Sequence, residues 1–317
     1  MIATACSPVV AASNSSASGP GNGLKVSPVR SELTVNPGQT VTLDVYVQNV
    51  TSQAATFQAL INDFVASGDE SGSPALILNS NKSAPSHGLK QFIQPVSNFS
   101  LKPGQQKDVK VVISIPKNAA GGGYFGAVRF APASTAALST SGASLSASVA
   151  SLILVRVPGN IVDQMSIASF DARSGNNAHG IFTSNKNISA VVRFQNEGNV
   201  QEQPFGTIVV KDMHGHKIAS YAVNNVKPAG NVLPNSIRKF SVPLDKISSF
   251  GRYTLEGNFG YTSTGKLLTA TATFYVIPIP LIVAAIILVV IILVAIFEIP
   301  RLIRRYNKRI LRRAGRR

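Results

Sequence analysis

The chain has 317 residues and a formal net charge of +16, from 30 Lys and Arg against 14 Asp and Glu. A basic balance of this size can indicate nucleic-acid binding, but nine of the 30 basic residues lie in the last 19 positions, and the remainder has no dense basic cluster. The distribution therefore argues against a nucleic-acid partner. Cys6 is the only cysteine, which excludes a disulfide within the chain; in an exported protein this is more typical of a bacterium than of an animal secretory route.

Residues 1–23 are small and apolar at first and then rich in Ser and Gly. We interpret them as the remnant of a signal peptide followed by a flexible linker, although no basic segment precedes the apolar part. The alternative is a chain without a signal. The residues before Cys6 resemble a lipoprotein cleavage site only loosely, because the usual aliphatic residue three positions earlier is missing.

Residues 24–159 are predicted to form a first immunoglobulin-like β-sandwich, because short alternating runs are separated by Pro, Gly and Asn. Alternate residues of the strand at 40–50 should point to opposite faces. The inward set is Val41, Leu43, Val45 and Val47, and the outward set is Thr42, Asp44, Tyr46 and Gln48. A Pro-Gly-Gln sequence precedes this strand at 37–39 and a second strand at 103–105, and its Pro and Gly suit the centre of a type II turn.

Two segments of the first sandwich are predicted to be exposed loops. Residues 133–146 are rich in Ser and Ala without a period, and residues 67–74 contain the adjacent carboxylates Asp69 and Glu70. The glycines at 121–123 indicate a tight turn or bulge at the entry of a strand. Sandwich domains bind through end loops and strand edges, so these two loops and the exposed edges are candidate binding surfaces.

Residues 160–275 are predicted to form a second immunoglobulin-like β-sandwich related to the first. In both units a strand ends in Asn (Asn49 and Asn196), a polar turn follows, and the next strand carries an aromatic residue (Phe57 and Phe205). A hairpin is expected with its turn at His214 and Gly215. The boundary between the sandwiches is placed at 158–160, where Pro, Gly and Asn follow one another.

Residues 276–298 are predicted to be a single transmembrane α-helix, because the segment 274–297 has no charged residue and about 20 apolar residues cross a bilayer of ~30 Å. Pro278 and Pro280 lie at the helix entry, where a missing N–H costs little, and Tyr275 suits the outer interface. Residues 299–317 form a basic tail, predicted to be cytoplasmic and to lie along the anionic inner leaflet. Its basic residues are Arg301, Arg304, Arg305, Lys308, Arg309, Arg312, Arg313, Arg316 and Arg317.

Groups suited to catalysis or metal binding are few. The four histidines, His87, His179, His214 and His216, lie beside Gly or in polar loops, and only His214 and His216 suggest a weak surface metal site. Asp69 and Glu70 lack the spaced oxygen ligands of a calcium loop, and no nucleophile elbow, HExxH motif or P-loop occurs. We therefore predict no enzyme activity, cofactor or metal, although a hydrolase whose groups converge from separate loops remains an alternative.

The layout resembles the WxL-interacting protein family of Gram-positive surface proteins. The shared segments in the first sandwich are Val35 to Asn49, Ile115-Pro116 and Gly121 to Phe130, and those in the second are Phe194 to Asn199, Val232 to Phe240 and Gly251 to Tyr253. The N-terminal segment departs from the family, because Val26 to Arg30 lacks the longer first segment expected there. The resemblance implies two immunoglobulin-like domains, a C-terminal membrane anchor, and docking of a wall-associated protein or peptidoglycan without catalysis.

The favoured hypothesis is a membrane-anchored adaptor on the cell surface, with the N-terminal domains outside and the tail in the cytoplasm. The alternative is an accessory subunit of a membrane transport or secretion complex that acts through its helix. The span has no Ser, Thr or Gln and no Gly-x-x-x-Gly face, and such residues are the ones that commonly join membrane helices. The sequence therefore favours a passive anchor.

Overall fold

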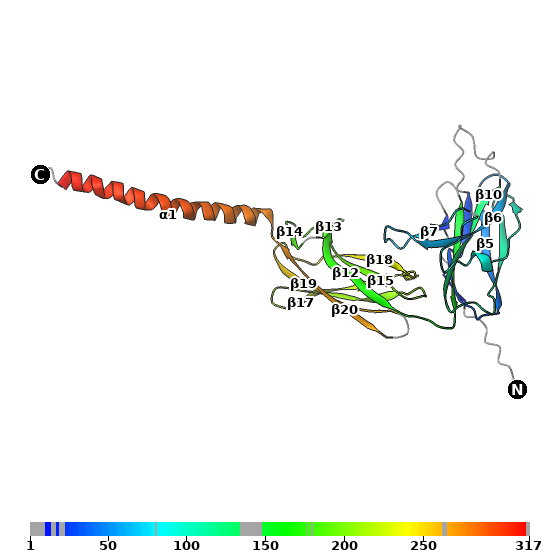
Figure 1. Cartoon of the computed structure of the whole chain (residues 1–317). Coiled ribbons are helices and arrows are strands. Elements are labelled where there is room, and N and C mark those ends of the chain that lie inside the picture. Colours follow the sequence, from blue (N-terminus) through cyan, green and yellow to red (C-terminus); the bar gives the residue numbers. More distant parts are fainter. Residues whose placement is uncertain are drawn as a thin grey trace.

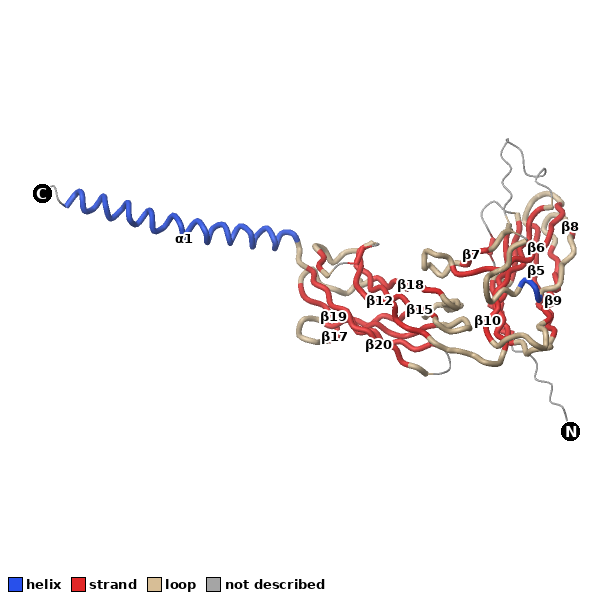
Figure 2. The backbone as a smooth tube through the Cα atoms, in the orientation of Figure 1, coloured by secondary structure: helices blue, strands red, loops and turns tan. Residues whose placement is uncertain are grey.

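The computed structural model describes residues 10–13, 17–18, 23–79, 81–133, 148–175, 177–178, 180–261 and 265–314. Two β-sandwiches follow one another, and a single long helix leaves the second one (Figure 1). Strands dominate both sandwiches, a short helical segment lies in the first, and the long helix is at the C-terminal end (Figure 2). The predicted architecture, all-β sandwich domains followed by one C-terminal helix, is confirmed.

The first sandwich packs two sheets around a core that runs from Leu24 to Val157. The four-stranded sheet has the order β2 (Ala17–Ser18), β3 (Leu24–Ser27), β5 (Thr40–Asn49), β9 (Gln106–Ser114). The facing sheet has the order β1 (Val10–Ser13), β4 (Arg30–Thr34), β11 (Val149–Val157), β10 (Gly122–Pro132), β6 (Ala55–Ala66), β7 (Pro74–Leu76), and β8 (Phe99–Leu101) also pairs with β6. A short 3-10 helix, η1 (Lys90–Phe92), lies between β7 and β8 in the chain.

The second sandwich has a core of its own, from Met165 to Val276. Its four-stranded sheet has the order β13 (Asn177–Ala178), β12 (Met165–Ser174), β15 (Ile188–Asn196), β18 (Ser236–Pro243). Its five-stranded sheet has the order β14 (Ile181–Phe182), β20 (Leu267–Val276), β19 (Gly251–Tyr261), β16 (Pro204–Lys211), β17 (Lys217–Val223).

The two sandwiches have the same topology. In each, an early strand of the four-stranded sheet pairs antiparallel with the strand that ends in Asn: β3 with β5, and β12 with β15. Between these two strands the chain crosses to the facing sheet, where β4 runs parallel to β11 and β14 runs parallel to β20. The repeat expected from the sequence is therefore present as a repeat of strand order.

Alternation and turn chemistry explain why β5 and β9 form. Val41, Leu43, Val45 and Val47 of β5 are all buried, as predicted, and their neighbours in the strand face outward. The two Pro-Gly-Gln turns are closed alike: Gly38 and Gly104 have φ of 82° and 73°, which type II turns require at this position. In each turn the Gln side chain accepts a hydrogen bond from the backbone N–H of the first turn residue, Asn36 or Lys102.

A buried asparagine occupies the same position in both sandwiches. The amide of Asn49 donates to the carbonyls of Gln53 and Leu101, at 2.8 and 3.1 Å. The amide of Asn196 donates to the carbonyls of Val200 and Val232, at 2.7 and 2.9 Å. Each side-chain oxygen accepts from the backbone N–H two residues later in the chain. The Asn that the sequence comparison identified therefore closes the same corner twice.

A tyrosine corner also occurs twice. Tyr124 follows the start of β10 by two residues, and its hydroxyl donates to the carbonyl of Ala120 at 2.9 Å. Tyr253 follows the start of β19 by two residues, and its hydroxyl lies 3.1 Å from the carbonyl of Phe250 and 3.2 Å from that of Ser248. A Tyr that bonds back to the chain a few residues upstream is a hallmark of immunoglobulin-like folds.

The predicted aromatic residue is present in both repeats, Phe57 in β6 and Phe205 in β16, but the two side chains pack differently. Phe57 of β6 is 2% exposed, whereas Phe205 of β16 is 56% exposed. Counted from the buried asparagines, Pro204 rather than Phe205 is the equivalent of Phe57, and Pro204 is buried. A shift of one residue moves a side chain to the other face of a strand, so the similar spacing of the two phenylalanines placed them on opposite faces.

Helix α1 runs from Ile279 to Ala314 without interruption at Pro300, and thus covers both the predicted span and most of the predicted tail. Pro280 is its second residue, where a missing backbone donor is tolerated. Among the described residues, this is the one helix long and apolar enough to cross a membrane, over Ile279–Ile303. The predicted domain boundaries at 159 and 275 stay predictions. The predicted signal remnant lies largely outside the described residues, as do nearly all of the loop 133–146, Cys6, His179, Arg316 and Arg317.

Candidate functional site

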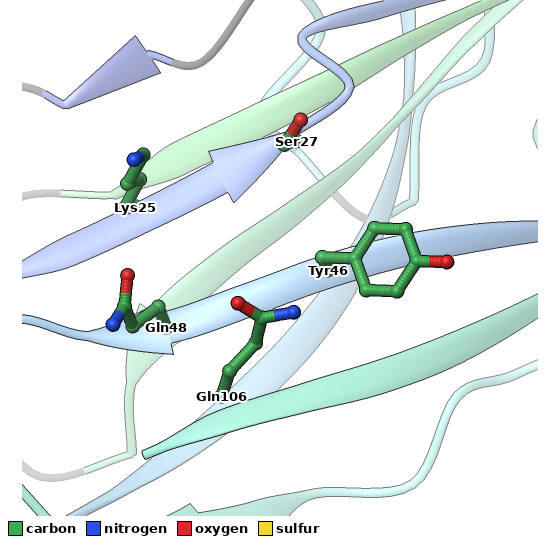
Figure 3. Close-up of a pocket in the computed structure, with 5 residues that line it drawn as sticks. All are labelled: Lys25, Ser27, Tyr46, Gln48 and Gln106. Carbon is green, nitrogen blue, oxygen red and sulfur yellow. The ribbon is translucent and has the colours of Figure 1, made fainter. Parts of the chain in front are cut away.

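The outer face of the four-stranded sheet in the first sandwich carries a polar hollow. Side chains of β3, β5 and β9 line it (Figure 3), and its volume is about 220 Å³. We call this surface the β5 face; it is lined by Lys25 and Ser27 of β3, Tyr46 and Gln48 of β5, and Gln106 of β9. The sequence placed Tyr46 and Gln48 on the outward side of β5, and the structure confirms this because both neighbours in the strand, Val45 and Val47, are fully buried.

Strand register brings the five side chains together. Tyr46 lies opposite Ser27 on one side, and Gln48 lies opposite Lys25 on the same side and Gln106 on the other. Directly opposed side chains on one sheet face are only about 4.5–5.5 Å apart at Cβ. Sequence analysis did not find Lys25, Ser27 or Gln106, since they belong to strands whose register depends on pairing far along the chain.

Charges border the β5 face on one side. Lys110 forms an ion pair with Asp44 at 3.1 Å and lies 3.9 Å from Asp108. The hydrogen bond to Asp44 and the two nearby carboxylates raise the pKa of Lys110 above its ordinary value. Tyr46 itself is an exposed aromatic ring within a polar surface. The face thus offers one flat ring, two amides, a hydroxyl and an ammonium group, a set suited to hydrogen-bond a polar polymer and to stack on it.

The loop at 67–74 has a structural role. Glu70 forms a bidentate ion pair with Arg193 of β15, with Nε 2.7 Å from Oε2, and the Glu70 carbonyl accepts from the Lys239 N–H of β18 at 2.9 Å. Ser67 and Ser71 donate hydrogen bonds to Asp69 and lower the pKa of its carboxyl to about 2. Both carboxylates of the loop are therefore engaged by protein donors, and the loop predicted as an open binding surface contacts the second sandwich.

Further polar and apolar contacts join the two sandwiches. Glu32 of β4 accepts from Asn231 at 2.9 Å and from Gln203 at 3.3 Å, and the carbonyl of Ala229 accepts from Arg30 at 2.9 Å. Leu233 of the second sandwich packs on an apolar cluster of the first that is formed by Phe64, Phe125, Ala127 and Leu154. A hollow of about 60 Å³ remains beside these residues. It is too small to make this junction the stronger candidate site.

The turn between β16 and β17 brings three groups together that could hold a metal ion. Asp212, His214 and His216 each offer one ligand atom, and these atoms lie within 4.8 Å of one another. One oxygen of Asp212 accepts from the backbone N–H groups of His214 and His216, both at 2.9 Å, so the carboxylate also shapes the turn. The two histidines are exposed, as expected for a hairpin turn. His87 lies elsewhere, with Nδ1 2.7 Å from the carbonyl of Gly123.

Glu202 is a fully buried acid in the second sandwich. Its backbone forms a bridge with Val232, the residue whose carbonyl also accepts from Asn196. Burial raises the pKa of Glu202 to about 8, and a hydrogen bond with Asp163 acts in the same direction. Asp163 is also 3.4 Å from Arg156 of β11. The Glu202 carboxyl lies near the junction of the sandwiches, and no carboxylate of the described residues lines the hollow of the β5 face.

Of the predicted tail residues, Arg301 forms an ion pair with Glu298 at 2.6 Å within α1. The six predicted tail residues from Arg304 to Arg313 lie within the helical backbone of α1. Their placement at a membrane surface stays a prediction.

Comparison with solved structures finds similar chains of low identity. The class 5 fimbriae chaperone CfaA is 13% identical, with a TM-score of 0.39 over 81% of this chain and 100% of the other. The E. coli chaperone DraB is 15% identical, with a TM-score of 0.34 over 78% and 97%. The Pseudomonas aeruginosa CupB2 chaperone is 11% identical, with a TM-score of 0.33 over 78% and 98%. None of the curated proteins compared with the sequence matches it.

Comparison with protein families finds a match within the first sandwich. Residues 31–132 match the family described as WxL Interacting Protein, peptidoglycan binding domain. Tyr46, Gln48 and Gln106 of the β5 face lie inside the matched range, and Lys25 and Ser27 lie just before it. The match supports a cell-surface binding protein. The resemblance to the WxL-interacting proteins is thereby confirmed, carried by residues 31–132 of the first sandwich.

Proposed function

We propose that the chain is a membrane-anchored surface adaptor that binds peptidoglycan through the β5 face of its first sandwich. The observation that carries the proposal is the hollow around Tyr46, which lies within or beside the range matched to a peptidoglycan-binding family. Peptidoglycan presents sugar rings, amides and carboxylates. Tyr46 would stack on a sugar ring, Gln48 and Gln106 would hydrogen-bond amide groups, and Lys25 would pair with a carboxylate.

The anchoring part of the proposal rests on α1. The stretch Ile279–Ile303 is long enough to cross the bilayer, and the basic residues from Arg301 onward lie at and beyond its C-terminal end. Positive residues flank the cytoplasmic ends of membrane helices, so the sandwiches would lie outside and the tail inside. The tail would rest on the anionic inner leaflet, and the sandwiches would be held within reach of the wall.

Co-sedimentation of the full chain, in detergent, with purified insoluble peptidoglycan tests the proposal. Tyr46→Ala should weaken binding by about 5- to 30-fold, as expected for loss of an aromatic anchor of about 1–2 kcal/mol. Tyr46→Trp should retain binding, because the flat ring is kept. Phe205→Ala, which removes an exposed aromatic of the second sandwich, is the matched control and should bind like the wild type.

Equal binding by all of these variants would place the contact elsewhere, and no binding by the wild type would remove peptidoglycan as the ligand. Replacing the apolar part of α1 with an unrelated apolar helix addresses the alternative function. A passive anchor tolerates the exchange, whereas an accessory subunit that acts through helix contacts loses its function.

A further inference from the structure

The second sandwich connects to α1 with almost no linker. Strand β20 ends at Val276 and α1 begins at Ile279. The two residues between them are held at both sides, since the N–H of Ile277 donates to the carbonyl of Phe182 at 2.8 Å and the N–H of Leu281 donates to that of Pro278 at 3.0 Å. Figure 1 shows the helix leaving directly from this end of the sandwich. If α1 enters a membrane, this end lies at the membrane surface.

Large apolar side chains are exposed at this end, which we call the helix-proximal end. Ile181 pairs with Tyr275 near the end of β20, just before the helix begins. Phe250 precedes Gly251, which pairs with Val276, the last residue of β20. Met213 lies at the tip of the β16–β17 hairpin, which extends past the Lys211–Thr254 pair toward the same end. All four of Ile181, Met213, Phe250 and Tyr275 are exposed, Phe250 to 53% and Met213 to 58%.

The loops that carry these side chains are well held. The hydroxyl of Tyr253 bonds to the carbonyls of Ser248 and Phe250, and the side-chain amide of Asn185 donates to the carbonyl of Ile247 at 2.9 Å, which joins the two neighbouring loops. Phe250 remains exposed on this loop, so folding removes little of its apolar surface from water and stabilises the sandwich little. Clusters of exposed apolar residues commonly mark a contact surface, and here the surface continues into the apolar helix.

Charges at the same end suit lipid headgroups. Three cationic side chains are exposed around the apolar residues, whereas the nearby Asp212 and Asp245 are engaged by the backbone of the histidine turn and by the hydroxyl of Tyr221. The three are Lys186, Lys246 and Arg252. Aromatic and apolar side chains bordered by Lys and Arg are typical of segments that lie in the bilayer interface.

We propose that the helix-proximal end of the second sandwich is a lipid-docking surface, with Phe250 and Met213 inserted among the headgroups of the outer leaflet. The proposal rests on the membrane anchoring argued above and goes beyond it: the second sandwich is seated on the bilayer and does not swing freely on its helix. The first sandwich is then held at a fixed height above the membrane, because the two sandwiches contact each other directly.

The absence of tryptophan from the chain allows a sharp test. Full-length Phe250→Trp is reconstituted into phosphatidylcholine–phosphatidylglycerol vesicles, with and without bromine at shallow acyl positions. An interfacial residue lies ~5–10 Å into the headgroup boundary, so the brominated lipids should quench most of its emission and the spectrum should shift to the blue. Met213→Trp, on a separate hairpin, should behave in the same way.

Leu267→Trp is the matched control. Leu267 is 68% exposed and pairs with Gly260 at the opposite end of the same two strands, so its emission should be unaffected by bromine. If the chain floats with the vesicles but neither Phe250→Trp nor Met213→Trp is quenched, lipid docking is wrong while anchoring stands. Equal quenching of Leu267→Trp would also overturn it. If the chain does not float with the vesicles, the anchoring itself fails.

Discussion

The two sandwiches share strand order and both corner residues, yet they use the same sheet face differently. Tyr46 lies three residues before the buried Asn49, and Arg193 lies three residues before the buried Asn196. Tyr46 faces a hollow, whereas Arg193 is paired with Glu70 from the other sandwich. Equivalent positions on equivalent strands thus border an open hollow in one sandwich and form a domain contact in the other.

A second position differs in a similar way. Six residues after the buried asparagine, the first sandwich has Ala55, paired with Leu101, and the second has Glu202, bridged to Val232. The position tolerates a small apolar side chain in one case and a buried carboxyl in the other. Conservation of strand order therefore constrains the backbone at these sites, and the side chains vary with what each sandwich contacts.

The largest expected effect tests whether the two corners are equivalent. Asn49→Ala and Asn196→Ala each remove a side-chain amide that donates two hydrogen bonds and accepts one from the backbone, so each should lower the stability of its own sandwich by about 2–4 kcal/mol. Hydrogen–deuterium exchange of the full chain in detergent reports the sandwiches separately. Asn258→Ala, at an exposed position of β19, should change stability by less than about 0.5 kcal/mol. Markedly unequal losses of stability in the two sandwiches would show that the two buried asparagines are not equivalent.

The next effect concerns Glu202 and depends on pH. Its pKa of about 8 lies above the unfolded value of 4.5, so the folded state holds a proton that the unfolded state releases. The stability is therefore fully present below pH 4.5 and is lost as pH rises toward 8. Glu202→Gln stays neutral and should be more stable than the wild type at pH 8, by about 1–3 kcal/mol.

Thermal unfolding of the full chain at pH 5 and pH 8 measures this difference. The wild type should lose stability between the two values, and Glu202→Gln should lose less. Glu197→Gln removes an exposed carboxyl from the same sandwich and should keep the wild-type decline. If the stability of the wild type does not fall with pH, Glu202 is ionised in the folded state. The difference between Glu202 and Ala55 would then have no effect on the free energy of unfolding through pH.

Local sequence predicted the parts of the fold that depend on local chemistry. Alternation assigned both faces of β5, and the Pro-Gly-Gln turns and paired asparagines indicated the repeat before any strand was paired. Register was not predictable in this way: Phe57 and Phe205 looked equivalent but lie one residue apart in the repeat, and one residue exchanges the faces of a strand. The β5 face was only half predicted, because Lys25 and Gln106 reach it through cross-strand pairing.

The role of Glu70 was beyond local reasoning altogether. Its partner, Arg193, lies 123 residues later in the sequence, and neither residue has a local pattern that indicates the other. An acidic pair in a Ser- and Gly-rich loop has the composition of a solvated turn. Only the packing of the two sandwiches turns it into a contact, so composition alone predicts an exposed binding loop.

The smallest expected effect tests this contact, and with it the contrast between Arg193 and Tyr46. In a double-mutant cycle of Glu70→Ala and Arg193→Ala, the coupling should be about 1 kcal/mol, because both side chains are partly exposed. Exchange of the Lys239 amide, which donates to the Glu70 carbonyl, should become faster in each variant. The hydrogen bond from Arg193 lowers the pKa of Glu70, so the coupling should persist at neutral pH and be lost as pH falls through that lowered pKa.

The ion pair between Lys211 and Glu256, at 2.6 Å within one sheet of the second sandwich, is the matched control. Its removal should leave exchange at Lys239 unchanged. A coupling of zero between Glu70 and Arg193 would make Arg193 an ordinary surface residue and its sheet face as open as the β5 face. In that case the second sandwich would have to be tested for polymer binding as well, since occupation by the loop is what distinguishes the two faces.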